Sequence, residues 1–503
     1  MNSRSKGILL SYMNTILGMI CGIFVSSFLL RSLGDTEYGL YQTITAFATY
    51  LVMLEFGTGT VMSRNIAICH GEGNDQEVLN KNITTIWYIN VVLSILIVIV
   101  SIVFYCNIGY IYSKTMTEAQ IFMAKRLFVV ITGYLVVSFF TQTISGIPLG
   151  MEEYTFAQKL NLFRLLTRTL ILVFCVRWKP FAMTIVLIDL LFGVISFVIT
   201  FVFCKIKYNI RLKLYYFDKS ILVDIMPLCF AMFLQTIVNQ ANSSVDKFVI
   251  GIKMSMESVA VYSIAQYIYS IFSSITTVPI SMFLPQVAKD ISSGKEGVAL
   301  TDTFIQPCRL VVMLGGSMMF GFIAVGKQFI SIVYGEDKVV SWLYALIIII
   351  PMFVNMTNGV LVNVLDILKK RQYRSYVLIL TTILNIILTV LLIDHYGIIG
   401  AVIATAISTF LGQILAMNIY YARRLHIRVL RLFYNAYKGI LPFQMLACII
   451  SFVIASFISN NIISLFIGGI IYVLISGILI YLFGMNKEEK AKVVSIKSRY
   501  GRG

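Results

Sequence analysis

Fourteen apolar runs, separated by short polar turns, follow one another along this chain of 503 residues. Each run approaches or exceeds the roughly 20 apolar residues that an α-helix needs to cross a ~30 Å hydrocarbon core. This alternation predicts an all-α polytopic membrane protein with 14 transmembrane helices. The predicted spans are residues 8–30, 40–62, 83–106, 121–147, 160–178, 180–203, 221–250, 258–285, 303–333, 339–364, 373–393, 397–422, 440–458 and 461–483.

The basic residues predict the orientation of these spans. With the N-terminus inside and each lysine or arginine assigned to the nearer side, 30 of the 40 fall in inner segments and 10 in outer ones. A wrong span count would reverse this division partway along the chain, so the positive-inside rule supports both count and orientation. We therefore expect a multi-pass protein of the bacterial cytoplasmic (inner) membrane with both termini cytoplasmic. The net charge of +17 is spread over separate turns and predicts no nucleic-acid partner.

The connections between spans argue against most enzymes. The longest outer connection, residues 107–120, has 14 residues, and the longest inner segments, 63–82 and 484–503, have 20. None can hold a catalytic domain, and the chain has no GxxxxGK[ST] phosphate loop. The eight cysteines and three histidines lack metal-ligand spacing. We predict a non-enzyme without catalytic residues, cofactor or metal. A membrane-embedded polysaccharide polymerase is the enzyme alternative, although such a protein is expected to carry a large outer loop.

Two turns in the sequence indicate an internal repeat. Residues 33–41 join spans one and two, and residues 250–262 join spans seven and eight; each has a hydrophobic residue before glycine, then a polar turn with glutamate, then tyrosine. A six-span period keeps both halves in the same orientation, the type of repeat that places a substrate site between halves. The predicted divisions are an N-lobe of spans one to six (1–215), a C-lobe of spans seven to twelve (216–425), and two further spans with a basic cytoplasmic tail (426–503).

With these features the chain resembles a known family. It is similar to the Wzx-type oligosaccharide flippases, the polysaccharide transporters of the MOP (multidrug, oligosaccharidyl-lipid, polysaccharide) superfamily, over about residues 5–425. The resemblance rests on Leu33-Gly34 and Tyr38-Gly39-Leu40-Tyr41, on Asp246, Ile250-Gly251 and Tyr262-Ser263-Ile264-Ala265, on Pro279, Pro285, Tyr334-Gly335 and Asn385, and on residues 396–405, which read YGIIGAVIAT. The chain departs from the pattern at Ser258-Val259-Ala260, where a glycine is expected before the tyrosine.

The resemblance implies two six-helix lobes around a central cavity. It also implies alternating access that moves undecaprenyl-diphosphate-linked oligosaccharide to the outer leaflet for capsule, O-antigen or exopolysaccharide synthesis. The expected partners are this lipid-linked substrate, membrane lipids, and the polymerase and glycosyltransferases of the same pathway. A multidrug exporter and a peptidoglycan-precursor flippase of the same superfamily are the alternatives. The two extra C-terminal spans argue against the exporter, which would have twelve.

Span seven carries a stripe of polar side chains that is a candidate wall for the substrate cavity. Gln235, Asn239, Asn242 and Asp246 follow one another at intervals of 4, 3 and 4, which places them on one helix face. A sugar head group needs such a hydrogen-bonding path, because an unsatisfied polar group in hydrocarbon costs several kcal/mol. The alternative is that the stripe joins neighbouring helices, as polar side chains often do in membranes.

Charged residues inside the spans are the remaining site candidates. Glu55, Arg168 and Asp189 lie within spans, whereas Arg31, Arg64 and Arg309 lie near span ends. Guanidinium groups bind phosphate oxygens bidentately, so we predict that the four arginines face the substrate cavity. Snorkelling at the span ends, and an ion pair between Arg168 and Asp189 or Glu55, are the structural alternatives. Glu55 and Asp189 are also candidates for ion coupling.

Overall fold

The computed structural model describes residues 3–72, 76–282, 297–367 and 371–487, together with positions 287, 289, 291, 293 and 489–491. This part of the chain consists of helices and the turns that join them, and it contains no strand. The predicted all-α membrane fold is therefore confirmed. The chain divides into two compact units, Met1–Ala260 and Val261–Gly503. The lobe boundaries at 215 and 425 stay a prediction.

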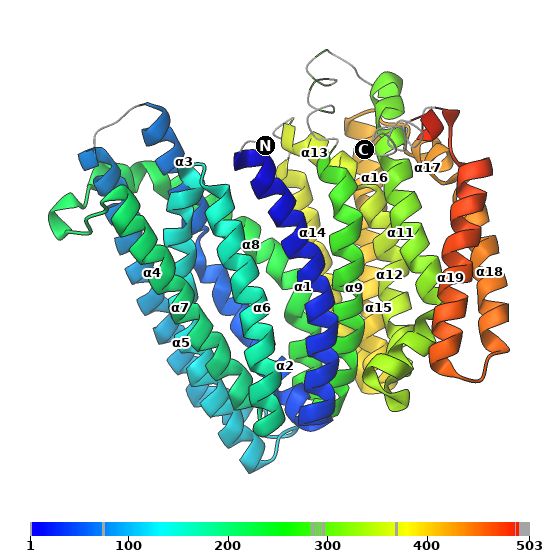
Figure 1. Ribbon diagram of the computed structural model, residues 1–503, viewed down its shortest axis with the longest axis horizontal. Helices are drawn as coiled ribbons and strands as arrows, with labels where there is room; N and C mark the ends of the chain where they lie inside the picture. The colour runs from blue at the N-terminus through cyan, green and yellow to red at the C-terminus, as the bar shows by residue number, and fades with distance from the viewer. Residues whose placement is uncertain are drawn as a thin grey trace, which may run out of the picture. The chain divides into compact units, whose positions relative to one another are not determined.

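Unit 1 is a bundle of long helices. Its elements are α1 (Ser3–Leu33), α2 (Asp35–Leu51), the 3₁₀ turn η1 (Val52–Glu55), α3 (Thr58–Gly71), α4 (Gln76–Ile111), α5 (Glu118–Gly150), α6 (Tyr154–Trp178), α7 (Ala182–Tyr208), η2 (Leu214–Tyr216), α8 (Lys219–Lys253) and the first turn of α9. Within the bundle, α5 packs against α3, α4 and α7, α1 packs against α6, and α8 packs against α2. Figure 1 shows α4, α5 and α7 side by side.

Unit 2 contains the rest of α9 (Met256–Met282) and the later helices. These are α11 (Gly297–Tyr334), η3 (Glu336–Lys338), α12 (Val340–Thr357), α13 (Gly359–Ile367), α14 (Arg371–Tyr396), α15 (Ile398–Thr409), the π-helical η4 (Phe410–Ala416), α16 (Met417–Arg424), α17 (Val429–Tyr437), α18 (Leu441–Ser456), α19 (Asn461–Leu479) and the π-helical η5 (Ile480–Gly484). The pair α18 and α19, orange to red in Figure 1, packs against α11.

Where the structure describes them, the predicted spans coincide with these helices, with two interruptions and one addition. Residues 40–62 are divided into α2, η1 and α3, and residues 339–364 into α12 and α13. The short helix α17 was not predicted. Within the described residues, nine helices are long and apolar enough to cross a membrane, or ten if α17 and α18, bent by 44°, count as one. The count of fourteen is consistent with this fold and stays a prediction.

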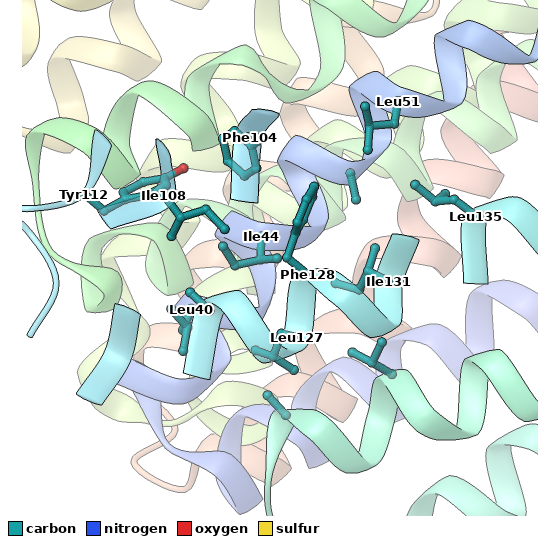
Figure 2. Close-up of a cluster of buried hydrophobic side chains, with 14 of the residues drawn as sticks. Leu40, Ile44, Leu51, Phe104, Ile108, Tyr112, Leu127, Phe128, Ile131 and Leu135 are labelled. Carbon is teal, nitrogen blue, oxygen red and sulfur yellow. The ribbon is translucent and has the colours of Figure 1, made fainter. Parts of the chain in front are cut away.

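The core of unit 1 lies where α2, α4 and α5 meet. Leu40 and Ile44 of α2, Phe104 of α4, and Leu127 and Phe128 of α5 are all buried there (Figure 2). The rings of Phe104 and Phe128 meet edge to face at 4.9 Å between centroids, a favoured aromatic arrangement. This cluster holds α2 firmly up to the point where the predicted second span is interrupted.

Side chains from outside the predicted spans fix the starts of two helices, α8 and α7. The Asp218 carboxylate accepts a hydrogen bond from the backbone N–H of Ser220 at 2.8 Å, and the hydrogen bonds from Ser220 lower the pKa of Asp218. Glu37, the glutamate of the first repeat turn, accepts from the backbone N–H of Ala182 at 2.8 Å. It thereby caps the N-terminus of α7, where the helix dipole favours a carboxylate.

Candidate functional site

A polar cavity of about 440 Å³ lies between α3, α5, α6 and α7 of unit 1. Two of its lining residues are charged, Glu55 at the end of η1 and Arg164 of α6. The other polar lining residues are Thr60, Ser63, Thr141, Gln142, Ser145, Gln158, Asn161, Ser196 and Thr200. A space with so many polar groups inside predicted spans must be hydrated or filled by a polar ligand, because such groups are costly in hydrocarbon. It is the candidate functional site of this unit.

The α3 wall of the cavity is fixed by close backbone contact with α5. A β-carbon on Gly146 would overlap the carbonyl oxygen of Gly59, and one on Gly150 would lie 2.6 Å from the carbonyl oxygen of Ser63. Gly146 and Gly150 form a GxxxG pair, the spacing that lets membrane helices approach closely. The hydroxyls of Thr58 and Thr143, 2.8 Å apart, join the same two helices.

The α6 wall is held by a helix that lies outside the lining. The side-chain amide of Asn14 in α1 donates to the side-chain oxygen of Gln158 at 2.7 Å and to its backbone oxygen at 2.9 Å. Because Gln158 itself lines the cavity, this pair fixes both α6 and one of the polar groups that face the space.

A second polar centre adjoins the first. Arg164 donates to the Tyr134 hydroxyl at 3.2 Å, and Tyr134 together with Tyr41 and Asp189 lines a smaller cavity of about 170 Å³ between α2, α5 and α7. Asp189 forms an ion pair with Arg168, one turn beyond Arg164 on α6. The structure therefore brings Arg168 and Asp189 together, as the structural alternative expected, while a role of Arg168 in substrate binding stays a prediction.

Arg164 was not predicted as a site residue, although the sequence carries a signal for it. Asn161, Arg164 and Arg168 are spaced by 3 and 4 residues, the same one-face pattern that identified the polar stripe of span seven. Arg164 lies only a few residues inside the predicted span, where a charged side chain usually snorkels to the membrane surface. In the structure it lines the cavity instead.

The other predicted site residues lie apart from this cavity. Arg31 is exposed in the last turn of α1, and Arg64 is exposed on α3. Asp246 is buried near the end of α8, whereas the side chains of Gln235, Asn239 and Asn242 lie outside the described part of the structure. The substrate roles assigned to these six residues stay predictions.

Arg309 lies in a different environment, buried among backbone carbonyls and a carboxylate. Its Nε and Nη2 donate to the two carboxylate oxygens of Glu489 at 2.8 and 3.1 Å. Nη1 donates to the carbonyls of Asn435 and Lys438 at 3.2 and 3.3 Å, and Nη2 also donates to that of Gly484 at 2.5 Å. These five bonds match the five N–H donors of a guanidinium, so none remains for a substrate phosphate.

The two turns that repeat in the sequence contact each other in the structure. A β-carbon on Gly39 would overlap the carbonyl oxygen of Met256, and one on Gly251 would lie 2.8 Å from the side chain of Thr43. The Thr36 hydroxyl also donates to the Glu257 carboxylate. Gly39 thus permits an approach to backbone that no larger residue allows, and Gly251 lies close against a side chain, both on the face predicted to be outside.

Comparisons with known proteins agree with this architecture. The chain matches the family model described as polysaccharide biosynthesis protein over residues 5–289. It is 24% identical over 175 residues to the probable low-salt glycan biosynthesis flippase Agl15 of Haloferax volcanii, and this match spans 34% of the chain and only 36% of that relative.

Solved structures share the fold at low sequence identity. The lipid II flippase MurJ in an inward closed conformation has a TM-score of 0.70 at 15% identity, covering 94% of this chain and 98% of that one. An inward-facing multidrug resistance MATE family transporter of the MOP superfamily has a TM-score of 0.63 at 16% identity, covering 81% and 95%. Since the family model covers more than half of the chain, the predicted resemblance is confirmed: this multi-pass membrane protein belongs to the polysaccharide biosynthesis protein family and has the fold of MOP superfamily transporters.

Proposed function

We propose that this protein moves undecaprenyl-diphosphate-linked oligosaccharide units from the inner to the outer leaflet of a bacterial cytoplasmic membrane. The observation that carries this proposal is the match of residues 5–289 to a polysaccharide biosynthesis family on a transporter fold. The role is transport, not catalysis, and the product supplies synthesis of a cell-surface polysaccharide. Glycosyltransferases would make the substrate on the inner face, and a polymerase would use it on the outer face.

The residues proposed for the substrate path have the chemistry that such a substrate requires. The lipid tail stays in the bilayer, while the sugar hydroxyls and the diphosphate need polar partners throughout their passage. Buried Asp246 and the predicted amide stripe on α8 would meet the hydroxyls, and Arg31, Arg64 and Arg168 would meet the phosphates. Arg168 would then exchange Asp189 for a phosphate during transport. Arg309 is outside the proposed path because its donors are occupied.

The contact between the two repeat turns supports alternating access. Residues 36–43 meet residues 251–257 through Gly39 and Gly251, on the face predicted to be outside. In the proposed cycle this contact closes the outer face while substrate enters from the cytoplasm, and it separates to release the head group.

Complementation of a flippase-deficient strain tests the proposal. With protein levels matched, the wild-type gene should restore surface polymer, and Arg168→Ala should restore less than Arg168→Lys, which keeps the charge but loses the bidentate fork. Arg177→Ala is the matched control, because Arg177 is exposed in the last turn of the same helix. Activity of Arg168→Ala equal to wild type would remove Arg168 from the substrate path.

The same strains separate the alternatives. Rescue of a strain that lacks its peptidoglycan-precursor flippase, without rescue of surface polymer, would favour that substrate. Drug resistance without polymer would favour an exporter. A strain that lacks this gene separates a flippase from a polymerase. Single lipid-linked repeat units on the outer face of its membrane would indicate a polymerase, because loss of a flippase leaves these units on the inner face.

A further inference from the structure

The predicted second span is interrupted well inside its length. After η1 ends at Glu55, Phe56 and Gly57 both adopt left-handed backbone conformations, with φ of 55° and 63°, and α3 begins at Thr58. The interruption creates a helix end at Glu55, and the last carbonyl groups before such an end lack their usual helical partners. Such half-helix C-termini carry partial negative charge and are common places for coupling ions in transporters.

Glu55 places a carboxylate at this half-helix end, facing the 440 Å³ cavity. Among the described residues it has no hydrogen-bond or ion-pair partner, and Arg164 is the one other charged group of the lining. Arg164 itself contacts the Tyr134 hydroxyl. The titratable groups nearest to the interruption at Phe56 and Gly57 are Tyr50 along α2 and Cys229 along α8. Neither of them lines the cavity.

We propose that Glu55 is a proton-binding site that couples the proton gradient to the conformational cycle, an inference that rests on the proposed flippase function. A hydronium ion in the cavity transfers a proton to one carboxylate oxygen, and the proton later leaves to water on the other side. A proton fits this single carboxylate better than a metal cation, because proton binding needs no shell of several fixed oxygen ligands.

Contacts of Phe56 and Gly57 connect the protonation state of Glu55 to the position of α8. The Phe56 ring stacks on that of Phe233 at 4.2 Å between centroids, and a β-carbon on Gly57 would lie 2.7 Å from Met232. A change of backbone conformation at residues 55–57 therefore displaces α8, the helix that carries Asp246 and the predicted polar stripe. Loss of charge at Glu55 removes its repulsion from the adjacent carbonyl groups, which favours a different backbone at the break.

Infrared difference spectroscopy of the purified full-length protein in lipid vesicles tests the binding site directly. Stepping the pH should produce a band of protonated carboxylic acid that Glu55→Gln removes, that Glu55→Asp shifts, and that Glu118→Gln leaves unchanged. Glu118 is an exposed acid at the start of α5 and serves as the matched control. A Glu55→Gln spectrum equal to that of the wild type would overturn the proposal. Loss of the wild-type band on addition of sodium at constant pH would also overturn it, because Glu55 would then bind sodium in place of a proton.

Transport assays then test the coupling. In the complementation strain, Glu55→Gln should lower surface polymer about tenfold, within the usual range of coupling between two sites, while Glu55→Asp should retain most of it. Phe56→Ala should keep the infrared band and lose polymer, because it removes the contact with Phe233 and leaves the carboxyl group. Full polymer from Glu55→Gln would refute coupling. If the wild-type gene gave no polymer, the proposed function would fail, while the infrared result would still stand on its own.

Discussion

At the scale of single residues, the glycines of the two repeat turns leave the least space for a larger side chain. Gly39 leaves no space for a side chain against the Met256 carbonyl, and because this neighbour is backbone, only movement of a helix would make room. Burial of Met256 in the core beside Leu40 fixes this approach further. The small residue at position 39 is therefore a condition for the two repeat turns to touch.

We expect Gly39→Ala to destabilise the protein by about 1–3 kcal/mol, the usual cost of overpacking a close contact. Thermal unfolding followed by size-exclusion chromatography of the detergent-solubilised protein would measure the effect. Gly469→Ala is the control, because nothing lies within 4 Å of a β-carbon at that helical position. Equal midpoints for the two variants would contradict the close approach at Gly39.

Two arginines show which side-chain contacts can be predicted from the sequence and which cannot. The ion pair of Arg168 with Asp189 was one of the structural alternatives, because two opposite charges in neighbouring spans attract strongly at low dielectric. The environment of Arg309 could not be foreseen, since Glu489 lies 180 residues away and a tail position gives no periodic signal. Its other partners are backbone carbonyls, which no residue type reveals.

At the scale of elements, Arg309 joins four segments of unit 2. It lies on α11, binds carbonyls at the ends of α17 and η5, and forms a bidentate pair with Glu489. Buried Gln444 of α18 adds a second link, donating to the Met313 carbonyl of α11 at 2.9 Å. The two C-terminal spans are thus attached to α11 by polar groups as well as by apolar packing.

Arg309→Ala should lower stability by about 3–5 kcal/mol, because it leaves the Glu489 carboxylate buried and unpaired. Arg431→Ala should change stability by at most about 1 kcal/mol, since the Arg431–Asp302 pair is exposed. Both can be followed by thermal unfolding at matched protein concentration. A small effect of Arg309→Ala would mean that water or a mobile Glu489 replaces the lost partner.

The helices themselves were predictable, but their interruptions were not. Apart from these interruptions, the described apolar runs are largely helical, because a backbone in hydrocarbon must satisfy its own hydrogen bonds. Phe56 and Gly57, where the second span breaks, pack against Phe233 and Met232, and these partners lie more than 170 positions later in the chain. Short α17 was missed because its nine residues lack the length of a span.

At the scale of the whole molecule, the charge division predicts a definite topology. In cysteine-free protein carrying Ser113→Cys or Lys213→Cys, a membrane-impermeant maleimide should label residue 113 in intact spheroplasts and residue 213 only after permeabilisation. Both side chains are exposed, so accessibility does not bias the comparison. Labelling of residue 213 in intact spheroplasts would reverse the predicted orientation.

The contacts of Arg309 also limit how far the chain can be shortened from its C-terminal end. Reporter proteins are commonly joined to membrane proteins at successive cut points, and a cut before residue 489 removes the carboxylate that neutralises this guanidinium. The fusion would then be degraded or misassembled for a reason unrelated to which side of the membrane it lies on. Tags for purification or imaging should therefore follow residue 491, where every described partner of Arg309 is retained.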